Sequence, residues 1–178
     1  MIKLGRKSKL ILAAASALIL MAACQQKGAE PPSGSEAVKS ESGAAADTKK
    51  DSSKKTVVVT TSFLQDMTQQ LAGDTVNVEL IIPAGEDPHL YTAKPEDNKK
   101  LQSADLVLYH GLHFEGKMVE ALEQLGIAVS KNFPKDKIGQ MDMNGEVVTD
   151  PHFWFDIDLY RMAVKEACTA LSELNPEN

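Results

Sequence analysis

The chain has 178 residues, of which 43% are hydrophobic and 25% are charged, and its formal net charge at pH 7 is −6. An acidic chain without a basic stripe or a phosphate-cradling glycine motif is a poor candidate for binding nucleic acid. Its two cysteines, Cys24 and Cys168, are too few for a thiolate zinc cluster, an iron–sulfur centre or a c-type haem.

The first segment has the layout of a bacterial secretory leader. Four basic residues precede an apolar run over residues 10–23, which is shorter than a membrane span of about 20 residues. The run ends Leu-Met-Ala-Ala-Cys at residues 20–24, which resembles a lipobox. We therefore expect a signal peptide over residues 1–23 and a lipid on Cys24 that anchors the chain to the extracytoplasmic face of the cell membrane. The alternative is ordinary cleavage that leaves Cys24 as a free thiol.

A change of composition separates this leader from the rest of the chain. Residues 25–55 consist mainly of Ser, Gly, Ala, Glu, Lys and Pro, and we expect them, with the lipidated Cys24, to form a disordered tether with a reach of about 30 Å. Residues 56–178 are numerous enough for one domain with a hydrophobic core. Removing the leader would change the net charge from −6 to −10, because the leader holds four basic and no acidic residues.

Strand and helix patterns alternate along this domain. The β-branched residues 57–61 predict a buried strand, and Ser62 with Gln65 has the capping-box spacing of a helix start. That helix is expected to bury a face made of Phe63, Met67 and Leu71. The later elements are predicted as a strand at 76–82, a helix at 95–104, a strand at 106–109, a helix at 118–125, a strand at 127–129 and a helix from 156 or 158 to 174.

The order of these elements predicts the fold class. Strands that alternate with helices favour an α/β fold with a parallel sheet flanked by helices on both faces. Residues 132–150, which include two glycines, are expected to be irregular. Cys168 lies in the pattern of the last helix, where we expect it to pack as a small hydrophobic residue.

The tripeptide Asp-Pro-His occurs twice, at residues 87–89 and 150–152. Proline fixes its own φ and restricts the residue before it, so each histidine leaves its loop with little backbone freedom. Imidazole is the commonest protein ligand of transition metals, which makes His89 and His152 candidate metal ligands. His89 follows the second predicted strand, at the edge of the sheet where α/β proteins bind ligands. The alternative is a solvated or structural histidine in each loop.

Other residues near these motifs allow more than one interpretation. The segment 153–155, Phe-Trp-Phe, either shields a site or fills the core. His110 and His113 follow the third predicted strand, and a solvated histidine at a strand end is favoured over an extra metal site. No His-Glu-x-x-His or Gly-x-Ser-x-Gly motif is present, so we expect no catalytic residues and no enzymatic activity.

Four segments of the domain together resemble the metal-binding lipoproteins of bacterial zinc and manganese ABC importers, and the TroA-like subgroup is the nearest match. They are residues 57–63, 85–91, 104–118 and 150–156. The resemblance implies one lobe of a two-lobed periplasmic-binding-protein-like fold, which binds zinc or manganese and delivers it to a membrane permease. It implies that His89 and His152 are the first two metal ligands. His110 departs from the asparagine that the resemblance leads us to expect.

The resemblance also implies a second lobe that supplies two further ligands. This chain ends at residue 178, where the helix that links the lobes should begin, so we expect a truncated form that has the N-terminal lobe only. Such a lobe would hold a partial metal site and would self-associate through its exposed face. The alternative function is that of a surface adhesin or interaction lipoprotein that does not deliver metal.

Overall fold

The computed structural model of the protein describes residues 50–177. The predicted signal peptide, Cys24 and most of the predicted tether lie outside these residues. The first described residues, 50–55, belong to the stretch predicted as tether, and the side chain of Asn77 holds them. Its oxygen accepts a hydrogen bond from the N–H of Asp51, and its nitrogen donates to the carbonyls of Asp51 and Lys54.

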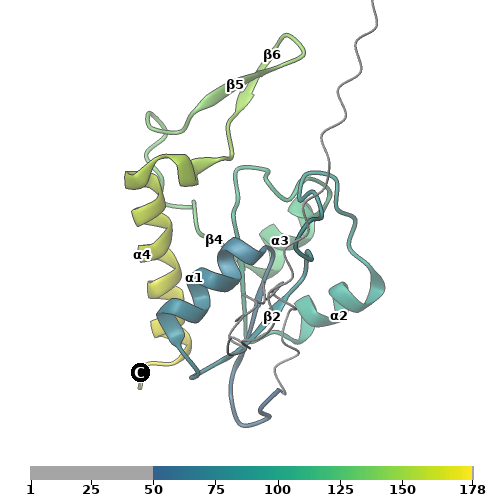
Figure 1. Ribbon diagram of the computed structural model, residues 1–178, viewed down its shortest axis with the longest axis vertical. Coiled ribbons are helices and arrows are strands. Elements are labelled where there is room, and N and C mark those ends of the chain that lie inside the picture. Colours follow the sequence, from purple (N-terminus) through teal and green to yellow (C-terminus); the bar gives the residue numbers. More distant parts are fainter. Residues whose placement is uncertain (1–49, 178) are drawn as a thin grey trace, which may run out of the picture. The chain divides into compact units, whose positions relative to one another are not determined.

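A four-stranded parallel sheet lies at the centre of the domain (Figure 1). Its strands are β1 (Thr56–Val59), β2 (Asn77–Leu80), β3 (Leu106–Tyr109) and β4 (Ile127–Ala128). The strand order is β2-β1-β3-β4, and every pairing is parallel. The valines of β1 are fully buried, as expected for a strand of a parallel sheet that is covered on both faces.

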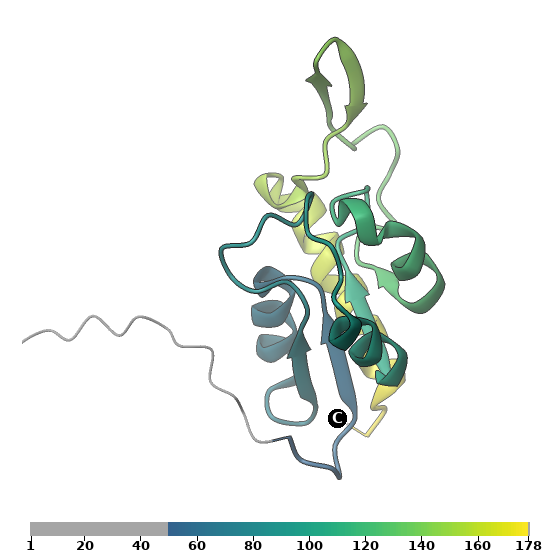
Figure 2. The same ribbon diagram turned by 90° about the vertical axis from the view of Figure 1, so that its right-hand side faces the viewer.

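Helices cover both faces of this sheet (Figures 1 and 2). Helices α1 (Ser62–Ala72) and α4 (Ile157–Leu174) contribute to the core on the face that includes Val57 and Val59. Helices α2 (Pro95–Ser103) and α3 (Val119–Leu125) contribute to a second core around Val58. Alternate valines of one strand thus point to opposite faces, and the predicted α/β fold is confirmed.

Helix α1 begins where the sequence predicts, but its cap and its buried face differ. Thr61, not Ser62, is the N-cap residue, and its hydroxyl accepts a hydrogen bond from the N–H of Leu64 at 3.4 Å. Leu64 is buried, whereas Phe63 is 52% exposed. Of the predicted face, Met67 is buried as expected, but Phe63 and Leu71 are exposed; the ring of Phe63 stacks on Trp154 instead.

The stretch predicted as irregular contains a β-hairpin. Strands β5 (Gln140–Met143) and β6 (Glu146–Thr149) pair in antiparallel fashion. The turn residues Asn144 and Gly145 have φ values of 56° and 91°, the left-handed conformations that a tight two-residue hairpin turn requires. The hairpin projects away from the sheet and leads directly into the second Asp-Pro-His segment (Figures 1 and 2).

Helix α4 follows this segment and a short 3₁₀ turn, η2 (Phe153–Phe155). Its buried residues follow the helical period and are Leu159, Ala163, Glu166, Ala167, Ala170 and Leu171. Cys168 lies off this face and is exposed, so the prediction that it packs in the core was wrong. Nowhere in residues 50–177 does a helix have both the length and the apolar character needed to cross a membrane.

Candidate metal centre

The histidines of the two Asp-Pro-His segments lie side by side. The ring centroids of His89 and His152 are 5.5 Å apart, and the ring planes are inclined by 66°. His89 belongs to the loop after β2, and His152 lies between the hairpin and α4. Because a zinc–nitrogen bond is about 2.0–2.1 Å long, modest rotations of two such side chains bring one nitrogen of each ring to a single ion.

The same backbone turn presents both histidines. Oδ1 of Asp87 accepts a hydrogen bond from the N–H of His89 at 2.9 Å, and Oδ1 of Asp150 accepts one from the N–H of His152 at 3.0 Å. An aspartate that binds the backbone two residues further on forms an Asx turn. The repeated tripeptide therefore specifies a repeated loop conformation.

The two imidazole rings have different surroundings. Nδ1 of His152 lies 2.7 Å from Oδ1 of Asp150, a contact that places the ring proton on Nδ1 and leaves the lone pair of Nε2 for a metal. The hydrogen bond from the N–H of His152 lowers the pKa of Asp150. The ring of His89 forms no hydrogen bond with any residue in 50–177; its neighbour is the ring of Phe114, at 4.9 Å between centroids.

The aromatic segment after His152 has both of the roles that the sequence left open. Phe153 is 4% exposed and packs in the core against Phe133, with 5.1 Å between ring centroids. Trp154 is half-buried and lies 5.3 Å from the His152 ring. It also stacks on Phe63 at 5.1 Å. The phenylalanine thus fills the core, and the tryptophan packs against the ring of His152.

A third histidine lies behind these rings. His110 is 1% exposed, so the favoured interpretation as a solvated histidine was wrong; it continues a buried strand. Its Nε2 lies 2.7 Å from Oγ1 of Thr61, and its Nδ1 has no partner among the described residues. Burial, with the nearby charge of His152, lowers the pKa of His110 to about 3. His113 is exposed.

The loop after β3 contains a strained turn and a buried carboxylate that sequence reasoning missed. Gly111, Leu112 and His113 have φ values of 82°, 54° and 61°, a conformation that costs about 1–2 kcal/mol for each residue other than glycine. Glu115 follows and is fully buried. The glycines on either side, Gly111 and Gly116, are the sequence signal that could have indicated a tightly packed loop here.

The described residues offer this centre two nitrogen ligands. Zinc in proteins is usually four-coordinate, but residues 50–177 contain no group of three or more His, Cys, Asp or Glu side chains arranged to hold a metal ion. Imidazole is a suitable ligand for zinc, and the pair lacks the soft thiolate or thioether ligands that select copper(I).

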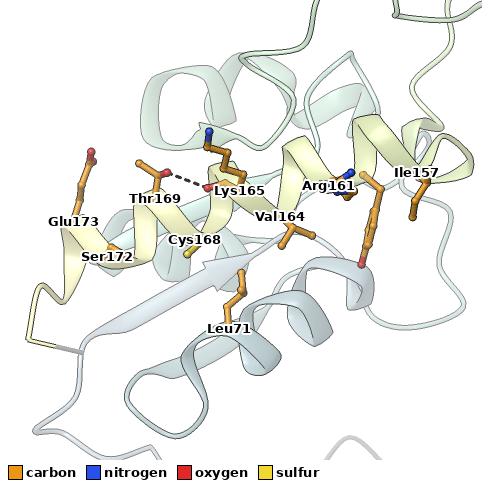
Figure 3. Close-up of a pocket in the computed structure, with 10 residues that line it drawn as sticks. Leu71, Ile157, Arg161, Val164, Lys165, Cys168, Thr169, Ser172 and Glu173 are labelled. Carbon is orange, nitrogen blue, oxygen red and sulfur yellow. Dashed lines mark hydrogen bonds between the residues drawn. The ribbon is translucent and has the colours of Figure 1, made fainter.

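A groove of about 890 Å³ lies between α1 and α4, away from the histidines (Figure 3). Its walls include Leu71 of α1 and Val164 and Cys168 of α4. Figure 3 shows these side chains facing one another across the two helices. The groove is open and mostly apolar and contains no histidine, so the chemistry of metal binding points to the histidine pair instead.

Three comparisons relate the chain to known proteins. Residues 57–178 match the model of a protein family described as zinc-uptake complex component A, periplasmic. The manganese-binding lipoprotein MntA of Bacillus subtilis (strain 168) is 42% identical over 124 residues, which are 66% of this chain and 40% of MntA. The zinc-binding protein TroA of Treponema pallidum (strain Nichols) is 38% identical over 118 residues, which are 64% of this chain and 37% of TroA.

A comparison of structures finds relatives of the same kind. A structure solved in a study of the metal-binding specificity of TroA superposes with a TM-score of 0.67 at 64% sequence identity, and the match covers 70% of this chain and 45% of that one. The chain therefore spans less than half the length of the relatives that it matches.

Proposed function

Because the chain belongs to the zinc-uptake complex component A family, we propose that it is the extracytoplasmic metal-binding component of an ABC uptake system. It captures a divalent transition metal, zinc or manganese, and delivers it to a permease in the membrane. The printed names of its relatives, a manganese-binding and a zinc-binding protein, support this metal class. Solute-binding components of such systems are not enzymes, in agreement with the expectation from the sequence.

In this proposal His89 and His152 bind the metal through their ring nitrogens. The observation that carries it is the 5.5 Å separation of two rings that come from separate copies of one loop motif. The contact between Asp150 and Nδ1 of His152 supports Nε2 as the coordinating atom of that residue. For His89 neither nitrogen is engaged by a residue in 50–177, so both are available.

The proposal also includes a lipid on Cys24 that holds the domain at the outer face of the membrane by the predicted tether. The lipobox-like residues 20–24 support this anchor. The name of the relative MntA, a lipoprotein, is in agreement with it. A lipid anchor and a tether of the predicted kind would keep the domain near a permease without fixing its orientation.

The two imidazoles set the affinity that we expect from this chain alone. A complete four-ligand zinc site is worth about 10–16 kcal/mol, so two ligands should supply about half of that, or about 5–8 kcal/mol. These values correspond to dissociation constants between about a millimolar and about a micromolar. Zinc should bind more tightly than manganese, since nitrogen ligands follow that order of intrinsic affinity.

Calorimetric titration of the full chain, kept in mild detergent, with zinc and then manganese tests this proposal. We expect one weakly bound ion per chain, and loss of binding in His89→Ala and in His152→Ala. His113→Ala is the matched control, because His113 is exposed and belongs to neither motif, and it should bind like the unaltered chain. If either motif variant keeps the binding of the unaltered chain, the assignment of the ligands is wrong.

A further inference from the structure

The carboxylate of Glu115 is buried in an unusual way. Its side chain is fully buried, and no lysine or arginine in residues 50–177 forms an ion pair with it. Its neighbours are hydrogen-bond donors instead. Oε1 lies 2.7 Å from both the hydroxyl of Thr60 and the N–H of His110, and Oε2 lies 3.4 Å from the N–H of Gly111. Taking a carboxylate out of water is costly without such partners, so these bonds fix Glu115 in one place.

The partners of Glu115 belong to the ends of two strands and to the strained turn. Thr60 directly follows β1, and His110 directly follows β3. Leu112 and His113, which are in the left-handed region, lie between the donor Gly111 and Glu115 itself. A strained backbone persists only where its surroundings hold it. Glu115 therefore ties the left-handed turn to the carboxyl end of the sheet.

The same loop touches His89 at two points. The ring of Phe114 meets the ring of His89 edge to face, at 4.9 Å and 80°. Gly116 lies under the backbone of His89 so closely that a Cβ there would be 2.1 Å from the carbonyl oxygen of His89. The exposed His89 is also held by the turn that Asp87 forms, and its ring lies 5.5 Å from the ring of His152.

We propose that Glu115 is a positioning residue for metal capture: by holding the loop of residues 110–116 against the sheet, it sets the ring of His89 opposite the ring of His152. The proposal rests on the proposed function, since it assigns Glu115 a part in the histidine pair. Glu115 acts through Phe114 and Gly116 and does not contact the metal. The ring of His152 does not depend on Glu115 in this proposal, because Asp150 binds it directly.

The primary test compares Glu115→Gln with Glu123→Gln in the full chain. Glutamine keeps the size of the side chain, but its NH₂ group replaces one carboxylate oxygen, so at least one of the backbone N–H groups that now donate to Glu115 loses its acceptor. Glu123 is exposed on α3 and serves as the control.

The readout is the NMR signals of the histidine rings in histidine-labelled, metal-free protein. The signals of His89 are assigned by their loss in His89→Ala. They should shift in Glu115→Gln, because the ring of Phe114 moves away from the ring of His89. Those of His113 should stay. Zinc affinity should fall by about 10-fold.

A milder pair of variants covers the case in which Glu115→Gln does not fold. Thr60→Val removes one donor to Oε1 and keeps the shape of a buried side chain. Thr68→Val is its matched control, because Thr68 is also buried and its hydroxyl has no partner among the described residues. Thr60→Val should shift the His89 signals in the same direction as Glu115→Gln, and Thr68→Val should leave them in place.

The outcomes separate the two proposals. Unchanged His89 signals in a folded Glu115→Gln variant, or in Thr60→Val if the first variant is unfolded, would overturn the role of Glu115. Unchanged zinc affinity in a folded variant whose His89 signals do shift would overturn it as well. Failure of the unaltered chain to bind zinc through His89 and His152 would refute the proposed function, while the metal-free signals would still decide whether Glu115 positions His89.

Discussion

The two Asp-Pro-His loops share a backbone turn and differ in what holds the imidazole. In both, the aspartate accepts a hydrogen bond from the N–H of the histidine. Only Asp150 also binds the ring of its own histidine; the ring of Phe114, from a neighbouring loop, lies 4.9 Å from the ring of His89 and 6.0 Å from that of His152. One sequence motif thus fixes the same local backbone twice, whereas the orientation of each side chain depends on tertiary contacts that the motif does not encode.

This difference fits the proposed function, in which the site both binds and releases an ion. A ring whose second nitrogen is hydrogen-bonded to a carboxylate is fixed in one tautomer and is the more basic ligand. The ring of His89 has no hydrogen-bond partner in residues 50–177 and is positioned by packing contacts such as that with Phe114. His152 would then be the fixed member of the pair and His89 the adjustable one.

The largest effect that we expect from this difference follows removal of the aspartates. Asp150→Ala deletes the partners of both the backbone N–H and the ring of His152, so zinc affinity should fall by about 10- to 100-fold. Asp87→Ala is the matched change in the other loop and deletes a backbone partner only; zinc affinity should fall by less than about 3-fold. Calorimetric titration of the two variants measures both losses. Equal losses would mean that the loops hold their histidines in the same way.

A smaller effect involves His110, the histidine that belongs to neither loop. Its folded-state pKa of about 3 lies below the ordinary value of 6.5, so the unfolded chain takes up a proton first as the pH falls. Its contribution to stability is therefore complete above about pH 6.5 and is lost progressively toward pH 3, by about 1.4 kcal/mol for each pH unit. Between pH 6.5 and pH 5 this amounts to about 2 kcal/mol.

Urea unfolding of the unaltered chain and of His110→Asn at these two pH values isolates this contribution. Two other titratable groups face His110: His152, whose charge lowers its pKa, and Glu115, whose own pKa is raised by burial and changes stability in the opposite direction. Both remain in the variant, so they cancel in the difference. On acidification, His110→Asn should lose about 2 kcal/mol less stability than the unaltered chain. The control His113→Asn should lose as much stability as the unaltered chain. An equal loss in all three chains would contradict the burial of His110 as a neutral ring.

The sheet could be predicted from the sequence because its signals are local. Residues 106–109 are apolar and nearly all β-branched or bulky, and they form β3 as predicted. The hairpin was missed although its Asn144-Gly145 turn is a strong local signal, because the strands on either side have only four residues each and are mostly exposed.

The candidate site could be predicted only in part, because its geometry is not local. The repeated tripeptide pointed to His89 and His152, but the 5.5 Å between their rings depends on how two distant loops pack. Glu115 had no signal of its own, since a glutamate is rarely buried. His110 was misjudged because burial continues past the end of β3 at Tyr109.

X-ray absorption at the zinc edge tests most directly whether the two loops share one ion. The full chain, loaded with one zinc per molecule, should show two imidazole nitrogens at about 2.0–2.1 Å, with oxygen atoms in the remaining positions. His89→Ala and His152→Ala should each reduce the imidazole count by one, and His113→Ala should leave it at two. A spectrum with a single imidazole, or nanomolar binding by a monomer with four protein ligands, would contradict a shared two-histidine site.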